Sequence, residues 1–213
     1  MIGRDEIDAV AADLQVRPTD VERDYVHGWL LAQLFADPIV SGHLVLKGGN
    51  ALRKGFFANT RYSADLDFVT PDGVDRDRLK QQLMRVSEAV SSATGVRFEN
   101  DQLSVREKSA IDSQLQVVEA RLYFYDFYGK PGRILLKVRM DISEYERLLL
   151  EPVARELIHP YSDAPACRVA PRVMWKMKMA HSSGWETTNP SPAKATTGGT
   201  RRGQGYQEAE AGA

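Results

Sequence analysis

The sequence predicts a mixed α/β chain of the α+β class, in which helices flank a mixed sheet. Three observations support this class. Apolar residues recur at helical spacing in two long stretches, short apolar runs end at Gly or Pro, and the turn sequence GKPG joins two β-rich stretches. A chain of 213 residues with 43% hydrophobic content can bury a core of this kind.

Each element is expected from a local pattern. Alternating apolar and polar residues predict strands, and apolar residues three or four positions apart predict helices. The GKPG joint predicts that the two strands it connects are antiparallel neighbours. We expect a first helix over 19–38, which begins at a capping box of Thr19 and Glu22. It is followed by a strand over 43–47, helical turns over 50–57, and a strand that carries Asp65 and Asp67 and stops before Pro71. The remaining expected elements are a helix over 76–93, strands over 114–128 and 133–142, and helices over 144–155 and 171–181.

Composition divides the chain into three parts. We expect an N-terminal segment over residues 1–17, a folded domain over 18–181 and a disordered tail over 182–213. The tail contains no Leu, Ile, Val, Phe or Met, so it cannot bury enough apolar area to offset its ordering entropy. Such an abrupt loss of aliphatic residues is typical of a tail that replaces a lost C-terminal portion. The alternative is a natural flexible tail.

Charge and cysteine content exclude several classes. The net charge is −1, so contact with nucleic acid must come from a local basic patch. The single cysteine, Cys167, excludes an internal disulfide framework and fits a reducing compartment. The N-terminus carries acids where a signal peptide carries bases, and no apolar run reaches membrane-spanning length. We therefore expect a cytoplasmic protein that does not contact a membrane.

Two acids one residue apart are the first candidate site. In a strand Asp65 and Asp67 point to the same face, about 7 Å apart along the backbone, while Leu66 and Phe68 point into the core. Two such carboxylates repel each other unless a cation lies between them, and Mg²⁺ prefers this kind of ligand. The alternative is a solvent-facing edge strand with two exposed acids.

A pair of glycines precedes these acids. Gly48 and Gly49 follow a strand directly, where backbone N–H groups that enter a helical turn can bind an anion. The alternative is an ordinary strand-to-helix turn. A phosphate cradle on one strand and a metal-binding acid pair on the next are the two halves of a phosphoryl-transfer site. Arg53 follows closely, and we expect it to lie beside the cradle and to assist binding.

A third acid is expected on a neighbouring strand. Lys137, Arg139 and Asp141 share one face of a predicted strand. Asp141 is therefore a candidate to complete a metal site. The alternative is a half-buried strand with a solvated polar face.

Three motifs carry a resemblance to a known family. KGGNALRKGF at 47–56, RYSADLDF at 61–68 and KVRMDIS at 137–143 resemble the nucleotidyltransferase toxins of the AbiEii type, including the MenT group, within the DNA polymerase β-like superfamily. The resemblance implies a polymerase β-like nucleotidyltransferase core for the domain over 18–181. The early helix, with Asp24 and Tyr25, is also similar to the family's N-terminal helix.

The resemblance also implies residue roles. It places the triphosphate at Gly48, Gly49 and Asn50 with help from Ser63, and the metal at Asp65, Asp67 and Asp141. The family's basic motif is similar to MWKMKMA at 174–180. Lys176 is its best match, for nucleotide binding and catalysis, with Lys178 as the near alternative. From the residues alone, a helical Lys beside Met and Trp is most often a snorkelling surface residue.

The implied function is Mg²⁺-dependent transfer of a nucleoside monophosphate from an NTP to RNA. The expected acceptor is the 3′ end of tRNA, whose extension blocks translation, and a cognate antitoxin is the expected protein partner. The family continues into helices that bear another aspartate, and the sequence after Lys176 has no match to it. Two alternatives remain: a truncated, catalytically impaired nucleotide-binding remnant, and an antibiotic-type nucleotidyltransferase with a small-molecule acceptor.

Overall fold

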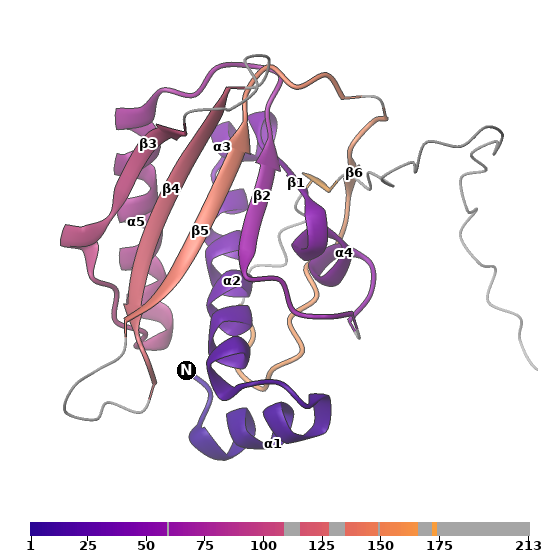
Figure 1. Ribbon diagram of the computed structural model, residues 1–213, viewed down its shortest axis with the longest axis vertical. Coiled ribbons are helices and arrows are strands. Elements are labelled where there is room, and N and C mark those ends of the chain that lie inside the picture. The colour runs from indigo at the N-terminus through magenta and orange to yellow at the C-terminus, as the bar shows by residue number, and fades with distance from the viewer. Residues whose placement is uncertain (59, 109–115, 128–134, 149, 166–171, 174–213) are drawn as a thin grey trace, which may run out of the picture. The chain divides into compact units, whose positions relative to one another are not determined.

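A mixed sheet carries its two long helices on one face (Figure 1). The computed structural model describes residues 1–58, 60–108, 116–127, 135–148, 150–165 and 172–173, all within one structural unit, Met1–Met177. Lys176, Lys178 and the predicted tail over 182–213 lie outside the described residues. The mixed α+β class predicted from the sequence is confirmed.

The elements have the following bounds in chain order. The helices are α1 (Arg4–Leu14), α2 (Pro18–Ala36), α3 (Pro38–His43), α4 (Gly48–Gly55) and α5 (Arg76–Thr94), with a 3₁₀ turn η1 (Asn100–Gln102). The strands are β1 (Val45–Lys47), β2 (Asp65–Val69), β3 (Ser104–Lys108), β4 (Val117–Tyr125), β5 (Leu135–Ser143), β6 (Val153–Ala154) and β7 (Arg172–Val173).

The sheet has the strand order β3-β4-β5-β2-β1-β7-β6. The β4–β5 pair is antiparallel, as the GKPG joint predicts. The pairs β2–β5 and β1–β7 are parallel, and β1–β2 is antiparallel. Parallel pairing between β2 and β5 aligns two strands separated by α5, β3 and β4 in the sequence, and this alignment determines where the candidate site residues meet.

Helix α2 supplies much of the core against the sheet. It begins with Arg17 as N-cap and Pro18 at the first turn, and no side chain caps it. The predicted capping box is therefore wrong. Pro18 fixes the start because its ring already has the helical φ and it lacks an N–H that would need a partner. Val21, Leu30 and Leu34 of α2 are almost fully buried.

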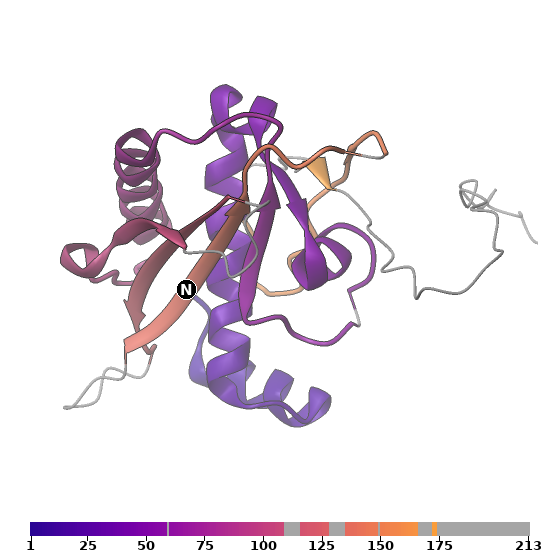
Figure 2. The same ribbon diagram turned by 45° about the horizontal axis from the view of Figure 1, so that its top comes forward.

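Helix α5 covers the sheet beside α2, and Figure 2 shows both helices on the same side from a second direction. The Asp75 side chain accepts from the Arg78 N–H at 3.0 Å, and the helix ends at Gly95 with φ 80°. An acid N-cap and a left-handed glycine C-cap are local signals, so the helix predicted over 76–93 is confirmed.

Two predicted helices are wrong in the part that the structure describes. Residues 144–148 and 150–155 contain turns and β6 where a helix was expected over 144–155. Tyr145 has φ 54° and Pro152 disfavours helical backbone before it. Arg172 and Val173 form β7 beside β1 in place of the start of a helix over 171–181. Val173 is buried there, and β-branched residues favour strands.

The segment before α2 also folds. Residues 4–14 form α1, with Ile7 and Ala11 buried in the main core. The sequence pattern assigned no element to residues 1–17. Within the part of the chain that the structure describes, no helix is long and apolar enough to cross a bilayer.

Candidate active site

A row of three acids crosses the sheet on its polar face. Strand register places Asp67 of β2 opposite Asp141 of β5, and Asp141 opposite Glu119 of β4. A base stands at each end of the row. In the strand register Lys47 of β1 lies opposite Asp67, and Arg106 of β3 lies opposite Glu119. Neighbouring strands lie about 5 Å apart, so three carboxylates stand on consecutive strands. Two of the three, Asp67 and Asp141, are predicted site residues.

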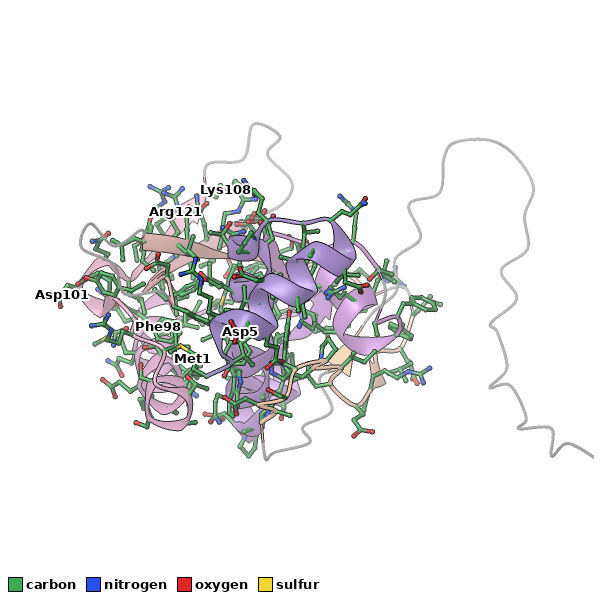
Figure 3. All side chains as sticks on the ribbon, turned by 90° about the horizontal axis from the view of Figure 1, so that it is seen from below. Met1, Asp5, Phe98, Asp101, Lys108 and Arg121 are labelled. Atoms are coloured by element: carbon green, nitrogen blue, oxygen red, sulfur yellow. The ribbon has the colours of Figure 1, made fainter. Side chains whose placement is uncertain are left out.

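The alternation of β2 produces this arrangement. Leu66 and Phe68 are fully buried in the core, so Asp65 and Asp67 face the opposite side, away from α2 and α5 (Figure 1). Asp65 pairs in register with Arg139. In Figure 3, Lys108 and Arg121 extend on the side of the sheet away from α5, which is the same polar face.

The glycine pair lies directly against these acids. Gly48 has φ 71°, a left-handed conformation that favours glycine. A Cβ at Gly48 would lie 2.4 Å from Oδ2 of Asp67, and a Cβ at Gly49 would lie 3.0 Å from Oγ of Ser63. Any side chain at Gly48 would therefore displace the Asp67 carboxylate, so the first turn of α4 and the acid pair form one site.

Asn50 connects α4 to the start of β2. Its side chain is fully buried, and Nδ2 donates to the carbonyl oxygen of Asp65 at 2.7 Å. The Ser63 hydroxyl donates to the same carbonyl at 3.4 Å. These bonds fix the backbone of Asp65. They give the Asn50 side chain a positioning role, while its predicted contact with phosphate stays a prediction.

The neighbouring acids perturb Asp67. The pKa of Asp67 is raised, first by burial and then by the charges of Asp141 and Asp65. Bases compensate the other two: Arg139 donates to Asp65, and Lys108 Nζ lies 3.1 Å from Oδ2 of Asp141. Oδ1 of Asp141 is buried and has no hydrogen-bond partner among the described residues. The site thus holds an excess of negative charge close to Asp67.

Glu119 is a fourth carboxylate that the sequence analysis missed. It is almost fully buried, and it accepts from Arg106 at 3.0 Å and from Arg121 at 2.8 Å. Although burial raises the pKa of Glu119, hydrogen bonds from these two arginines lower it below its usual range. The alternating sequence VVEARLY around it (117–123) was a signal that could have located it.

The donor set fits a hard divalent cation. Mg²⁺ binds carboxylate oxygens, and here Asp67 has a raised pKa while Asp141 retains an unpartnered oxygen. Within the described ranges no three His, Cys, Asp or Glu side chains are already gathered as a metal site. Asp65 and Asp141 are ion-paired with Arg139 and Lys108 instead. Asp65, Asp67 and Asp141 are nevertheless the residues that could hold the ion.

A second charged cluster lies behind the glycine helix. Asp24 of α2 accepts from Nε of Arg53 at 2.9 Å and from Nζ of Lys54 at 2.7 Å, and the hydroxyl of Tyr161 donates to it at 2.8 Å. Asp24 is 1% exposed and Lys54 is 0% exposed. Arg53 was expected beside the phosphate cradle, and that expectation is wrong because its guanidinium is buried against Asp24.

This cluster, Asp24 with Arg53, Lys54 and Tyr161, holds α4 against α2. Although burial alone raises the pKa of Asp24, the charges of Lys54 and Arg53 lower it to about 2. The resemblance names Asp24, whereas no local pattern predicts its burial beside Arg53 and Lys54. It positions the glycine turn and does not face the acid row.

Comparison with known proteins gives the family. A search among curated proteins found no match for this chain. Residues 29–174 match the family described as nucleotidyl transferase AbiEii toxin, type IV TA system. The match spans β1, α4, β2 and β5, which carry the glycine turn and the acids. The resemblance predicted from the three motifs is therefore confirmed, and the chain belongs to the AbiEii family of nucleotidyl transferase toxins of type IV toxin–antitoxin systems.

Proposed function

We propose that this nucleotidyltransferase moves a nucleoside monophosphate from an NTP to the 3′ end of an RNA, with tRNA as the acceptor, in a reaction that requires Mg²⁺. A toxin that extends tRNA would stop translation in the cytoplasm, and a cognate antitoxin would restrain it. The observation that supports the proposal is the close approach of Gly48 to Asp67, which brings the candidate phosphate-binding turn next to a candidate metal ligand.

The residues of the site have complementary roles in this proposal. The backbone N–H groups of Gly48 and Gly49 would bind the β- and γ-phosphates at the start of α4. Ser63, whose Oγ lies near Gly49, would donate to the same phosphates, as would Lys176. Asp65 and Asp67 would hold Mg²⁺, which supplies positive charge that offsets the charge developing on the phosphates. Asn50 would keep Asp65 in place through its bond to the Asp65 carbonyl.

The chemical step is a substitution at the α-phosphorus. The acceptor hydroxyl oxygen forms a bond to the α-phosphorus while the bond to the bridging oxygen of the β-phosphate breaks, and pyrophosphate leaves. Asp141 would take the hydroxyl proton or hold a second ion. Its Oδ1 suits either role because the atom is buried without a partner among the described residues.

The test uses the purified full chain, Mg²⁺, each labelled NTP in turn and total tRNA. We expect label to enter RNA from one or two of the four nucleotides, and Asp67→Asn to abolish incorporation. Exposed Asp101→Asn, outside the acid row, is the matched control and should behave like the wild-type chain. Incorporation that survives Asp67→Asn would refute the assignment of the acid pair.

A second candidate is a binding protein that holds a nucleotide without transferring it. The ion pairs of Asp65 with Arg139 and of Asp141 with Lys108 favour it, since both acids already have cationic partners. Thermal stabilisation by an NTP with Mg²⁺, without incorporation into RNA or a small-molecule acceptor, would select this candidate. Incorporation into an aminoglycoside-type acceptor in place of RNA would select the small-molecule enzyme.

A further inference from the structure

A cavity of about 480 Å³ lies beside the segment that leads into Asp65. It lies between the junction of α1 with α2 and the segment 60–64, which ends directly before Asp65 (Figure 1). Pockets that bind small ligands or single nucleotides have volumes of about 300–1,000 Å³. No site residue discussed so far except Ser63 lines the cavity.

Three arginines and a single carboxylate line the cavity. Arg17 and Arg23 both pair with Asp20, at 2.9 and 3.0 Å. Arg61 is exposed and has no carboxylate partner in the described part of the chain. Three guanidinium groups against one carboxylate leave an excess of positive charge. Guanidinium groups stay ionised at every physiological pH and match phosphate geometry well.

The remaining lining is suited to a nucleobase. Leu14 and Val16 give apolar surface, and Tyr62 contributes an aromatic ring. The guanidinium of buried Arg53 lies 3.9 Å from the centroid of the Tyr62 ring and also donates to the carbonyl of Ala58 at 2.9 Å. The wall that carries Tyr62 is therefore anchored to the Asp24 cluster. Aromatic and basic side chains together are typical of single-strand nucleic-acid sites.

The position of the cavity indicates which ligand it takes. Gly48 directly follows β1, so it lies on the side of β2 where β1 pairs. Arg23 lies on the other side, because its Nε donates to the carbonyl of Lys137 in β5 at 3.2 Å. In the order of the sheet, strand β2 thus lies between the glycine turn and the strand that Arg23 contacts. In phosphoryl transfer the attacking and leaving oxygens lie on opposite sides of the phosphorus, so the arginine side suits the acceptor.

We infer that this cavity binds the 3′-terminal nucleotides of the acceptor RNA. Arg17, Arg23 and Arg61 bind the backbone phosphates and Tyr62 contacts a base. The inference rests on the proposed transfer to RNA, and it names the surface that selects a single-stranded nucleic acid end as the acceptor.

The test measures RNA and nucleotide binding separately on the full chain. The RNA probe is a fluorescent single strand of on the order of ten nucleotides, followed by anisotropy over a series of salt concentrations. The variants are Arg61→Ala and Arg61→Lys, with Arg76→Ala on α5 as the matched control. Arg76 makes an exposed ion pair with Glu107, whose loss affects stability little.

We expect Arg61→Ala to weaken RNA binding about tenfold at low salt and to reduce the salt slope by about 0.7, the value for one lost contact with a single strand. Arg61→Lys should recover part of the affinity because it keeps the charge but loses the planar fork. Stabilisation by an NTP with Mg²⁺ should be unchanged in both variants, and Arg76→Ala should bind RNA like the wild-type chain.

Three outcomes would overturn the inference. RNA affinity within twofold of wild type in Arg61→Ala would remove the cavity from the acceptor path. A loss of NTP binding in place of RNA binding would assign the cavity to the nucleotide. Absence of RNA binding by the wild-type chain would also refute it. Failure of the proposed function is a separate result, because it is read from incorporation and from Asp67→Asn and not from the Arg61 variants.

Discussion

One group of ion pairs is buried and another is exposed, and only the exposed group can release its acids to a metal ion. Asp24 with Arg53 and Lys54 is shielded from water, whereas the side chains of Arg139 and Lys108, which pair with the acid row, are 33% and 47% exposed. A buried pair is held by the cost of separating its charges, while an exposed pair exchanges partners easily. The buried cluster therefore fixes the scaffold, and the exposed pairs can give up their acids to a metal ion.

The comparison also separates bases that look alike in the sequence. Arg53 and Arg61 lie eight positions apart around the same motif. Arg53 points into the core against Asp24, and Arg61 is exposed at the cavity. Proximity to the glycine pair in sequence did not distinguish a base buried in the scaffold from one exposed at a cavity, since only the folded structure shows burial.

The largest expected effect comes from breaking the buried cluster. Asp24→Asn leaves Arg53 and Lys54 buried without a negative partner, so we expect a loss of about 3–5 kcal/mol in the free energy of unfolding. Urea unfolding measures it, with exposed Asp13→Asn on α1 as the control, which should change stability by less than about 0.5 kcal/mol. A loss below about 1 kcal/mol for Asp24→Asn would show that the cluster does not hold the scaffold.

Breaking the acid row should affect catalysis and spare the fold. Burial, Asp141 and Asp65 raise the pKa of Asp67, so its ionised form costs stability at neutral pH and Asp67→Asn should leave the chain no less stable. Loss of a metal ligand should raise the barrier to transfer by about 3 kcal/mol or more. Incorporation rates and melting temperature measured on the same preparation test both parts. A marked fall in melting temperature would place Asp67 among the structural residues.

A buried acid without a strong base partner should respond to pH in the opposite sense to Asp24. Burial, followed by the charge of Asp126, raises the pKa of Glu22 to about 7. A raised folded-state pKa gives stability that is complete below about 4.5 and is lost as the pH rises through 7. The contribution of Glu22 to the unfolding free energy should therefore fall between pH 5 and pH 8, by on the order of 3 kcal/mol. Buried His27 and His159, whose pKa values are lowered by burial, contribute in the opposite sense over the same range.

Glu22→Gln isolates this contribution. The substitution removes the titrating group, so the change in unfolding free energy from pH 5 to pH 8 should be more positive than in the wild-type chain by on the order of 3 kcal/mol. Glu88→Gln on the exposed face of α5 should retain the wild-type slope. Melting temperatures across this range measure the difference. An identical slope in wild type and Glu22→Gln would mean that Glu22 is ionised in the fold at neutral pH.

The smallest effect is expected at the exposed pairs. Arg139→Gln removes the partner of Asp65, yet both side chains reach water, so the unfolding free energy should change by less than about 1 kcal/mol. Chemical unfolding at low and at high salt measures it, and Lys108→Gln should behave alike. A loss comparable to that of Asp24→Asn would erase the distinction between the two groups of ion pairs.

Local patterns predicted most of the fold. The helix at α5 follows from its spacing and caps, and the alternation in β2 correctly placed Leu66 and Phe68 in the core. The predicted helix over 144–155 failed because Glu144 is buried and accepts from the backbone N–H of Val74 at 2.6 Å. That bond belongs to tertiary structure, and no local propensity reveals it.

The sequence indicated which residues belong to the candidate site better than it indicated how they are arranged. Gly48, Asp67 and Asp141 lie close together in the fold. The register of Asp67 with Asp141, however, depends on parallel pairing between strands that are distant in the sequence. Alternation could have placed Glu119 on the polar face, and the resemblance named Asp24. The burial of each acid next to a specific base is nevertheless a property of the folded chain. The roles of Asn50, Ser63 and Lys176 as phosphate ligands remain predictions.

The parallel pairing of β2 with β5 also sets the order in which a newly made chain can become harmful. The ribosome completes the glycine turn and Asp67 well before it reaches Asp141, because α5, β3 and β4 intervene. The central strand pair closes only once β5 has emerged, and β7 joins the far edge of β1 later still. Such long-range closure is slow relative to local helix formation. A nascent chain therefore carries an incomplete acid row until β5 has been made.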